Sequence, residues 1–408
     1  IKKNEPICII SEKSLDCYKL IIACLKIGNP YFFLDPNQPY SRIKQILSNA
    51  KCRLVISDKT KLYKNNLLFK EFIKIKVKKK NTNISYFIDQ AYYMFTSGSS
   101  GEPKGAIINQ HNIKYLIDWA KKEYFFNDKT IHTALNPIYF DNSIFDFYAT
   151  IFNGGTLVVL NDKEILDPGF VEKVLQKYKC TSWFSVPTLI KFYMKLKLFK
   201  KNNFKYLKRF IFGGEGFTMP HLKKLYSIYG SRKIYSNVYG PTECTCICSS
   251  YNVTKKDLMR GNSFPPIGYL NYYFDGFLYN HSKGKKSNIG ELVLKGPAVG
   301  SGYLKKVDNS GFKKNPLEKR FEEIVYFTGD IMKYDKYKKL IFISRKDNQI
   351  KHMGYRIELE EIESRVRKLK YIEDVIVSQI FDKNYSKLVA TIKTKKYLPE
   401  KIYLKKIS

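Results

Sequence analysis

The residues from Thr96 to Gly105 read TSGSSGEPKG, a loop that combines glycines, hydroxyls and one lysine. Apolar runs on either side, at 92–95 and 106–108, predict two strands joined by this loop, so a disordered linker fits poorly. Glycine permits close backbone approach, hydroxyls donate hydrogen bonds and lysine adds positive charge, which together suit a polyphosphate. The spacing disfavours a P-loop NTPase, because Pro103 precedes the lysine where GxxxxGK[ST] requires glycine. The residues expected to bind phosphate are Thr96, Ser97, Gly98, Ser99, Ser100, Gly101 and Lys104.

A second group of chemically capable residues stands in NVYGPTE, residues 237–243, where a strand pattern runs into a turn. The group suits a nucleotide, because Tyr239 can stack on a base, Thr242 can donate to a phosphate and Glu243 can coordinate Mg²⁺. A turn with an incidental tyrosine is the alternative. The stretch FGGE, residues 212–215, also runs from a strand into a glycine turn.

Two further carboxylates stand where a ligand is plausible. Asp141 lies in the stretch FDNS beside aromatic and apolar neighbours, where a carboxylate is costly unless it meets a cation. The alternative is a helix N-cap made by Asp141 or Ser143. Asp330 ends the stretch YFTGD, where it can accept from a diol or simply occupy a turn.

The elements that must position these residues follow an α/β pattern. Strands and helices alternate between residues 157 and 235, which predicts βαβ units and a largely parallel sheet with ligands at the carboxyl ends of its strands. From Gly268 to Ile343 short strands and glycine turns predict a small barrel-like β subdomain. Residues 358–392 predict one helix followed by two strands, an α+β unit.

The composition narrows the class of partner. The chain has 408 residues, with 72 Lys and Arg against 37 Asp and Glu, and a net charge of +35. Because the basic residues are spread along the whole length, whereas a nucleic-acid footprint clusters, we expect no nucleic-acid partner. No apolar run reaches the ~20 residues that span a bilayer, so no membrane span is expected.

Eight cysteines are scattered without CxxC spacing. Cys244, Cys246 and Cys248 alternate, which on a strand would place them on one face, but no histidine stands near them to complete a zinc set. We therefore expect buried free thiols, a reducing compartment and a cytoplasmic location.

The motifs TSGSSGEPKG, NVYGPTE and YFTGD, with LKIGNPYFFLDP near the start and SRKDNQIKHMGYRIE near the end, resemble the adenylate-forming superfamily. The resemblance is to amino-acid adenylation domains of the nonribosomal peptide synthetase and D-alanine:carrier-protein ligase type. It implies an adenylation core over residues 1–345, with the barrel-like subdomain at about 265–343, and an incomplete lid over 346–408. Asp347 would be the hinge. The family lysine in a PxxxxGK context is missing, so we expect a fragment cut at both ends with impaired activity.

The resemblance also implies a reaction. An amino acid and ATP would form an aminoacyl-adenylate and pyrophosphate, and the phosphopantetheine thiol of an acyl or peptidyl carrier protein would then take the aminoacyl group. Thr96, Lys104, Thr242 and Glu243 would be catalytic, with Mg²⁺ on Glu243 and the substrate ammonium on Asp141. The phosphate loop would be joined in ATP or AMP binding by Gly214, Glu215, Asn237, Tyr239, Gly240, Thr242, Asp330 and Arg345.

Carried over position by position, the resemblance implies a substrate pocket lined by Asp141, Asn142, Phe145, Phe184, Ile211, Gly213, Val238, Cys246 and Ile247. Two phenylalanines would narrow the pocket and Gly213 would open it, which favours a small or medium uncharged amino acid. D-alanine ligases usually have cysteine at the Gly213 position, so the amino acid stays open. An acyl-CoA or aryl-acid ligase is the alternative of the same fold, and a catalytically degenerate nucleotide-binding module is the alternative of another class.

Overall fold

A computed structural model of the chain describes residues 2–58, 66–72, 74, 86, 88–97, 102–259, 264–305, 311–352, 355–369, 371–381 and 386–394. The N-terminal sheet has the order β4-β3-β1-β2-β5-β6 and is parallel except for β6. Its strands are β1 (Ile7–Ile10), β2 (Tyr31–Phe33), β3 (Leu54–Ser57), β4 (Asn66–Leu68), β5 (Gln90–Thr96) and β6 (Lys104–Asn109). The helices of this part are α1 (Leu15–Ile27), α2 (Tyr40–Asn49), α3 (Phe69–Phe72) and α4 (Gln110–Tyr124). Helix α1 ends at Gly28 with φ +70°, where glycine meets no Cβ penalty, as the pattern predicts.

The second sheet has the order β13-β12-β11-β10-β9-β7-β8, with its five βαβ strands parallel and β12 and β13 antiparallel. Its strands are β7 (Ile131–Ala134), β8 (Thr156–Val159), β9 (Ser182–Ser185), β10 (Arg209–Gly213), β11 (Ile234–Tyr239), β12 (Ser249–Asn252) and β13 (Tyr269–Leu270). The helices between them are α5 (Asn142–Ile144), a π-helical turn (Phe145–Ala149), α6 (Asp162–Ile165), α7 (Pro168–Lys177), α8 (Pro187–Lys195) and α9 (Met219–Tyr229). This confirms the predicted βαβ units.

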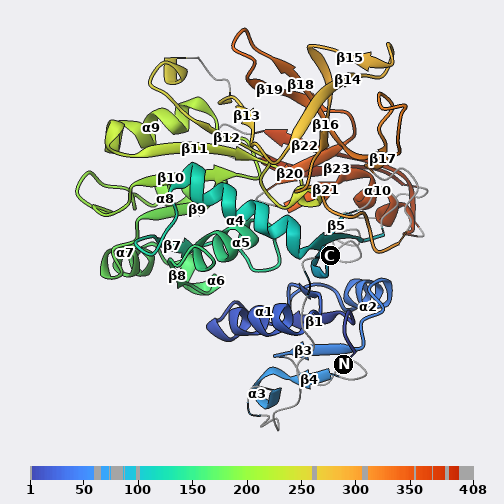
Figure 1. Cartoon of the computed structure of the whole chain (residues 1–408), viewed down its shortest axis with the longest axis horizontal. Helices are drawn as coiled ribbons and strands as arrows, with labels where there is room; N and C mark the ends of the chain where they lie inside the picture. Colours follow the sequence, from blue (N-terminus) through green and yellow to red (C-terminus); the bar gives the residue numbers. More distant parts are fainter. Residues whose placement is uncertain are drawn as a thin grey trace.

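An antiparallel sheet follows, in the order β15-β14-β16-β18-β17 with β19 also paired to β18. Its strands are β14 (Asp275–Asn280), β15 (Lys285–Lys286), β16 (Ile289–Lys295), β17 (Phe312–Lys314), β18 (Ile324–Tyr334) and β19 (Leu340–Arg345). The C-terminal part contains two hairpins and a helix: β20 (Gln349–His352), β21 (Tyr355–Glu358), α10 (Leu359–Arg367), β22 (Ile372–Phe381) and β23 (Ser386–Thr394). The expected class, α/β with a small β subdomain and an α+β end, is confirmed (Figure 1).

One apolar cluster joins the two large sheets. It contains Tyr31 and Tyr92 of the first sheet and Phe184 and Val238 of the second, and the hydroxyls of Tyr31 and Tyr148 lie 2.9 Å apart. Burying aromatic side chains of this size is worth roughly 2–3 kcal/mol each, so the sheets are held at a fixed relative position. That position decides which loops can meet.

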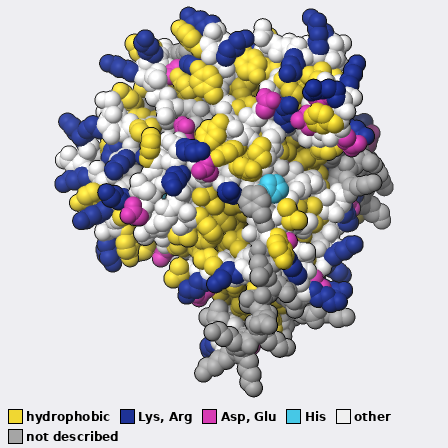
Figure 2. Space-filling view, viewed as in Figure 1, with side chains coloured by type: hydrophobic (Ala, Val, Ile, Leu, Met, Phe, Trp, Pro, Cys, Tyr) yellow, Lys and Arg dark blue, Asp and Glu magenta, His cyan; other side chains and the backbone are white. Residues whose placement is uncertain are grey.

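The surface is strongly basic. Figure 2 shows Lys and Arg side chains scattered over the visible face, mostly toward its rim, and more numerous than Asp and Glu. None of the helices within the described ranges is long and apolar enough to cross a membrane.

Candidate active site

The phosphate-type loop closes a hairpin. Strands β5 and β6 are antiparallel with Thr96 opposite Lys104, as the flanking apolar runs predict, and Thr96 is buried. The four central loop residues, Gly98 to Gly101, lie outside the described residues. Segment 300–304 packs along β6, where the Ile107 amide donates to the Gly302 carbonyl at 2.9 Å. The hairpin that begins and ends the loop is therefore held by a segment about 200 residues further along the chain.

Two predicted residues that are 101 positions apart meet next to this hairpin. The Thr242 hydroxyl donates to Asp141 Oδ2 at 2.6 Å, and both lie at carboxyl-side loops of the second sheet. Asp141 precedes α5 but makes no side-chain cap hydrogen bond, so the N-cap alternative does not account for its carboxylate. Ser143 donates to the carbonyls of Ile138 and Phe140, at 3.1 and 2.6 Å, so it is not a cap either.

Glu243 is almost fully buried, with 1% of its surface exposed. Its Oε1 accepts from the Tyr303 hydroxyl at 2.7 Å, and its main-chain carbonyl accepts from the Gly300 amide at 2.8 Å. The segment that holds β6 therefore also holds Glu243. Among the described residues no group of three or more His, Cys, Asp and Glu side chains could bind a metal. One carboxylate suits Mg²⁺, which proteins commonly bind with one or two carboxylates together with substrate phosphates and water, so the donor set fits that ion.

The three alternating cysteines are not on a strand. Thr242–Cys244 form a 3₁₀ turn, Cys246 has φ +74°, and β12 begins only at Ser249. All three thiols are buried and unpaired, and burial raises the pKa of each. The predicted free thiols are confirmed, whereas their placement along one strand face is wrong because the chain turns sharply here.

A buried polar network joins three other predicted residues. Asp330 accepts from the Tyr239 hydroxyl through Oδ2 and from Arg345 Nη1 through Oδ1, the latter at 2.9 Å. Arg345 also donates to both carboxylate oxygens of Asp347, at 2.8 and 2.6 Å. Burial and then the Asp330 charge raise the pKa of Tyr239, so its phenol stays protonated and donates. The network links β11, β18 and β19 to the start of the C-terminal part.

Six of the expected lining residues lie in the apolar cluster between the two sheets: Phe145, Phe184, Ile211, Val238, Cys246 and Ile247. The rings of Phe145 and Phe184 meet edge to face with centroids 5.2 Å apart. The π-helical turn places Phe145 at this contact, and such turns often occur at functional sites. Asn142 lies beside the cluster, with Oδ1 3.8 Å from Cys246 Sγ.

Gly213 does not open this region in the way expected. A Cβ there would lie 2.5 Å from the Val238 carbonyl oxygen and 2.6 Å from Val238 Cγ2, so Val238 fills the space. Gly240 is required for a similar reason, since its Cβ would lie 2.2 Å from the Cys246 carbonyl oxygen. Gly214 has φ +86°, a left-handed conformation that favours glycine.

Two further predicted residues have structural contacts. The Glu215 carboxylate accepts from the Thr188 amide in the first turn of α8, where a negative charge is favourable. Asn237 Nδ2 donates to the Pro266 carbonyl at 2.8 Å. Both side chains thus stabilise the loops around the site.

Sequence reasoning missed a fully buried network behind the phenylalanines. His132 Nε2 lies 3.1 Å from Asp146 Oδ1, and Asn136 Nδ2 contacts both Asp146 Oδ2 and the Phe184 carbonyl, at 3.0 and 3.2 Å. The buried Lys13 ammonium donates to the Asn136 carbonyl at 2.9 Å, and burial lowers its pKa to about 8. The FDNS motif stops three residues before Asp146, and nothing local marks the histidine as its partner.

Tyr303 and Lys351 were missed as well. The Lys351 ammonium lies 5.9 Å from the centroid of the Tyr239 ring, which brings the β20–β21 hairpin to the polar network. Lys351 stands inside the quoted stretch SRKDNQIKHMGYRIE, so a closer reading of that stretch could have found it. Tyr303 has no comparable signal, since it is one of 32 tyrosines.

Comparison with known proteins gives this arrangement a context. A family model described as AMP-binding enzyme matches residues 1–304. Gramicidin S synthase 2 of Aneurinibacillus migulanus is 28% identical over 389 residues, which are 92% of this chain and 8% of that protein. Malpinin synthetase of Mortierella alpina is 28% identical over 96% of this chain, and the chain spans 5% of its length. D-alanine–D-alanyl carrier protein ligase of Bacillus licheniformis is 28% identical over 94% of this chain and 77% of its own length.

Solved structures agree in fold. An artificially fused adenylation–carrier di-domain from Klebsiella oxytoca superposes with a TM-score of 0.84 at 20% identity, covering 97% of this chain and 80% of that chain. The adenylation domain AlmE of Vibrio cholerae, solved with glycyl-adenosine-5′-phosphate, gives 0.80 at 21% identity, covering 96% of this chain and 81% of that chain. With the family model matching well over half of its length, the chain belongs to the AMP-binding enzyme family and has the adenylation-domain fold.

Proposed function

We propose that this chain uses ATP to activate an amino acid as an aminoacyl-adenylate, releasing pyrophosphate, and then transfers the aminoacyl group to the phosphopantetheine thiol of a carrier protein. The observation that carries the amino-acid assignment is Asp141, a carboxylate 2.6 Å from Thr242 and close enough to Cys246 that its charge, after burial, raises the pKa of that thiol. A carboxylate at the border of an apolar cluster suits a substrate ammonium. The curated relatives, peptide synthetases and a D-alanyl carrier protein ligase, support the same class.

The chemistry requires alignment more than acid–base catalysis. The substrate carboxylate is already a nucleophile, so catalysis depends on holding it in line with the α-phosphorus and on neutralising the charge that develops there. Asp141 would hold the ammonium in place of its bond from Thr242. The Thr242 hydroxyl, so released, would contact the phosphates together with Thr96 and Lys104. Mg²⁺ bound by Glu243 and the phosphates would supply positive charge for the pyrophosphate leaving group.

The nucleoside would be held by the Tyr239–Asp330–Arg345 network. A carboxylate is a natural acceptor for the ribose diol, and the Tyr239 ring can pack against the base. We also propose that the core comprises residues 1–345 and that Asp347, bonded to Arg345, is the hinge of the C-terminal lid. Breaking this bidentate pair would free the lid to turn between the two half-reactions.

A small or medium uncharged amino acid fits the surroundings best. The Phe145–Phe184 contact and the Val238 side chain beside Gly213 would narrow the expected substrate region. No second charge among the lining positions would pair with an ionised side chain. The eight unpaired cysteines support a reducing cytoplasmic location.

The test is amino-acid-dependent ATP–pyrophosphate exchange by the full-length gene product, with glycine, both alanine enantiomers, serine, cysteine and the larger aliphatics. Exchange stimulated by one amino acid and lost in Asp141→Ala would support the proposal. A matched control is Asp16→Asn, a surface carboxylate paired with Lys19 on α1, which should exchange like the wild type. Exchange with aryl or fatty acids alone would support the acyl-ligase alternative, and ATP binding with no exchange would support a degenerate module.

A further inference from the structure

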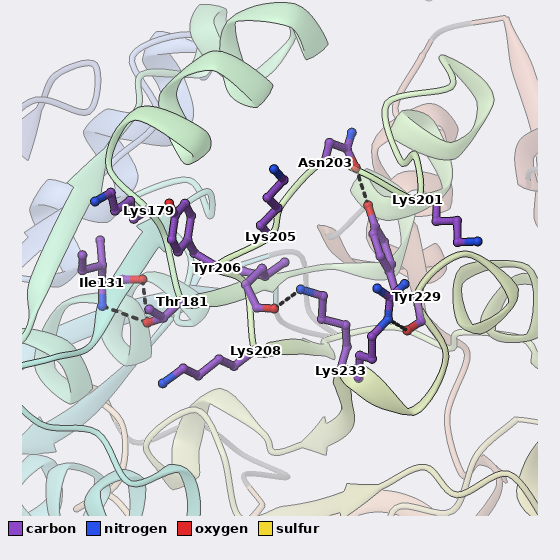
Figure 3. Close-up of a pocket in the computed structure, with 12 residues that line it drawn as sticks. Ile131, Lys179, Thr181, Lys201, Asn203, Lys205, Tyr206, Lys208, Tyr229 and Lys233 are labelled. Carbon is purple, nitrogen blue, oxygen red and sulfur yellow. Dashed lines mark hydrogen bonds between the residues drawn. The ribbon is translucent and has the colours of Figure 1, made fainter.

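Figure 3 shows the residues that line a cavity. This cavity has a volume of about 600 Å³ and lies at the edge of the second sheet where its parallel strands begin, opposite the edge of the candidate active site. Four of its lining residues stand at or just before the first residue of a parallel strand: Ile131 at β7, Thr181 at β9, Lys208 at β10 and Lys233 at β11. Asp141, Gly213 and Tyr239 follow or end strands of the same sheet at their carboxyl edge. The cavity is therefore separate from the proposed ATP and amino-acid sites.

The lining of this cavity is basic and contains no carboxylate. Its cations are Lys179, Lys201, Lys205, Lys208, Arg232 and Lys233. Within the described parts of the chain, none of them forms an ion pair with Asp or Glu. The sequence between Glu172 and Glu243 contains fifteen Lys and Arg residues and one carboxylate, Glu215. The basic residues are thus less evenly spread than the composition suggests.

The walls of the cavity are fixed before any ligand arrives. The Lys233 ammonium donates to the carbonyls of Phe204, at 2.8 Å, and Leu207, and this second bond is drawn in Figure 3. Asn203 Oδ1 accepts from the Tyr229 hydroxyl at 2.7 Å and from the Lys200 amide at 3.0 Å. These bonds tie the connection between α8 and β10 to the ends of α9 and β11. Burial and the neighbouring Arg232 lower the pKa of Lys233, as expected for a cation in a positive field.

The unpaired cations identify the chemistry of a ligand. Lys233 is committed to main-chain carbonyls and Arg232 Nε donates to the Tyr229 carbonyl at 3.3 Å, which leaves four lysines and the other nitrogens of the Arg232 guanidinium. They stand around a cavity whose size is typical of small-molecule sites. All of these cations are exposed, so solvent screens their mutual repulsion while their charged ends remain accessible to an anion. Phosphate groups match both lysine ammonium and arginine guanidinium donors. Tyr206, nearly half exposed, adds an aromatic wall with Lys179 5.6 Å from its ring centroid.

We propose that this cavity, the β7–β11 basic pocket, binds a small anion that carries several phosphate groups. The cations surround a bounded cavity, whereas a nucleic-acid groove would follow an extended backbone. A free polyphosphate and a phosphoinositide headgroup share this chemistry.

The test is calorimetric titration of the 408-residue chain with inorganic tripolyphosphate at 150 mM salt, with the ATP site filled by a sulfamoyl-adenosine analogue, which carries no phosphate and therefore leaves the pocket open. Saturable binding is expected, with an affinity at least tenfold weaker in Lys205→Gln/Lys208→Gln. The control Lys283→Gln/Lys285→Gln removes the same charge from the exposed β14–β15 turn and should bind like the wild type. Urea unfolding verifies that each variant folds. If the double variant does not fold, the single variant Lys205→Gln, at an exposed position, replaces it.

Two further arms separate the sources of phosphate. Vesicles of phosphatidylcholine with 5% phosphatidylinositol bisphosphate test whether the pocket binds a lipid headgroup. Vesicle binding that is lost in Lys205→Gln/Lys208→Gln would support the pocket and identify a lipid as the source of the phosphate groups. Absence of saturable tripolyphosphate and vesicle binding would overturn the proposal, as would equal loss in the pocket and control variants. Tighter binding of a 20-base-pair DNA duplex, weakened by the pocket variant, would also overturn it in favour of a nucleic-acid surface.

Discussion

Gly213→Ala is predicted to damage both the fold and the substrate region. The new Cβ would lie 2.5 Å from the Val238 carbonyl oxygen and 2.6 Å from Val238 Cγ2, so β10 and β11 must separate by at least about 0.5 Å before the contacts are tolerable. Because one of the clashing atoms belongs to the backbone of a paired strand, rotamer changes cannot relieve it. Overpacking of this kind costs roughly 1–3 kcal/mol.

The assay combines urea unfolding with amino-acid-dependent exchange. We expect a lower unfolding midpoint and an altered KM for the amino acid, because Val238 is an expected lining residue that must move. Gly213→Ala/Val238→Ala removes only the Cγ2 contact, so it should not regain full stability. The control Gly169→Ala lies in the first turn of α7 with its nearest contact at 3.4 Å, and it should be neutral or slightly stabilising. Wild-type stability and a wild-type KM in Gly213→Ala would refute the close approach of β10 and β11 at Gly213 and Val238.

Two other predictions rest on single hydrogen bonds and a third on buried thiols. Tyr303→Phe removes the hydrogen bond to Glu243, which is worth about 1 kcal/mol. The Mg²⁺ concentration for half-maximal exchange should therefore rise about fivefold. An unchanged value would argue against a metal role for Glu243. Asp330→Asn removes the charge that pairs with Arg345. It should raise KM for ATP roughly 10- to 100-fold with little change in KM for the amino acid. Equal changes in both KM values would contradict the proposal that Asp330 binds the nucleoside. Burial raises the pKa of the Cys24 and Cys180 thiols to about 12, so these thiols lose their protons at lower pH in the unfolded chain than in the folded chain. The free energy of unfolding should therefore fall as pH rises from about 9 toward 12, by roughly 1 kcal/mol per thiol and pH unit. Lys13, with its pKa near 8, opposes this trend as a single group. Urea unfolding midpoints at pH 8 and pH 10 measure how stability changes with pH, and Cys180→Ala should reduce this change. An unchanged pH dependence in Cys180→Ala would contradict a contribution from the buried Cys180 thiol.

Local signals were sufficient where neighbouring residues determine the structure. The apolar runs beside TSGSSGEPKG predicted the β5–β6 hairpin, and the helix ending at Gly28 followed from its pattern. The alternation of elements predicted the second sheet, and its carboxyl edge is where Asp141 and Thr242 meet.

Local signals were not sufficient where contacts with distant segments of the chain determine the position of a residue. Tyr303 reaches Glu243 only because segment 300–304 packs along β6, and His132 meets Asp146 only through the π-helical turn. The β7–β11 basic pocket could not be assembled from the sequence for the same reason: Lys179, Lys205 and Arg232 lie before different strands, and the sheet brings these strand starts together. The fifteen Lys and Arg residues between Glu172 and Glu243 mark the region but not which of them share a cavity.

The most direct test of amino-acid activation compares exchange with the preferred amino acid and with its des-amino analogue, in the wild type and in Asp141→Asn. If Asp141 holds the ammonium, the wild type should prefer the amino acid by about 10- to 100-fold in kcat/KM, since a hydrogen bond between charged groups contributes about 1.5–3 kcal/mol. Asp141→Asn should lose most of that preference while its affinity for ATP stays close to the wild type. Equal use of both acids by the wild type, or an undiminished preference in Asp141→Asn, would contradict the proposed function.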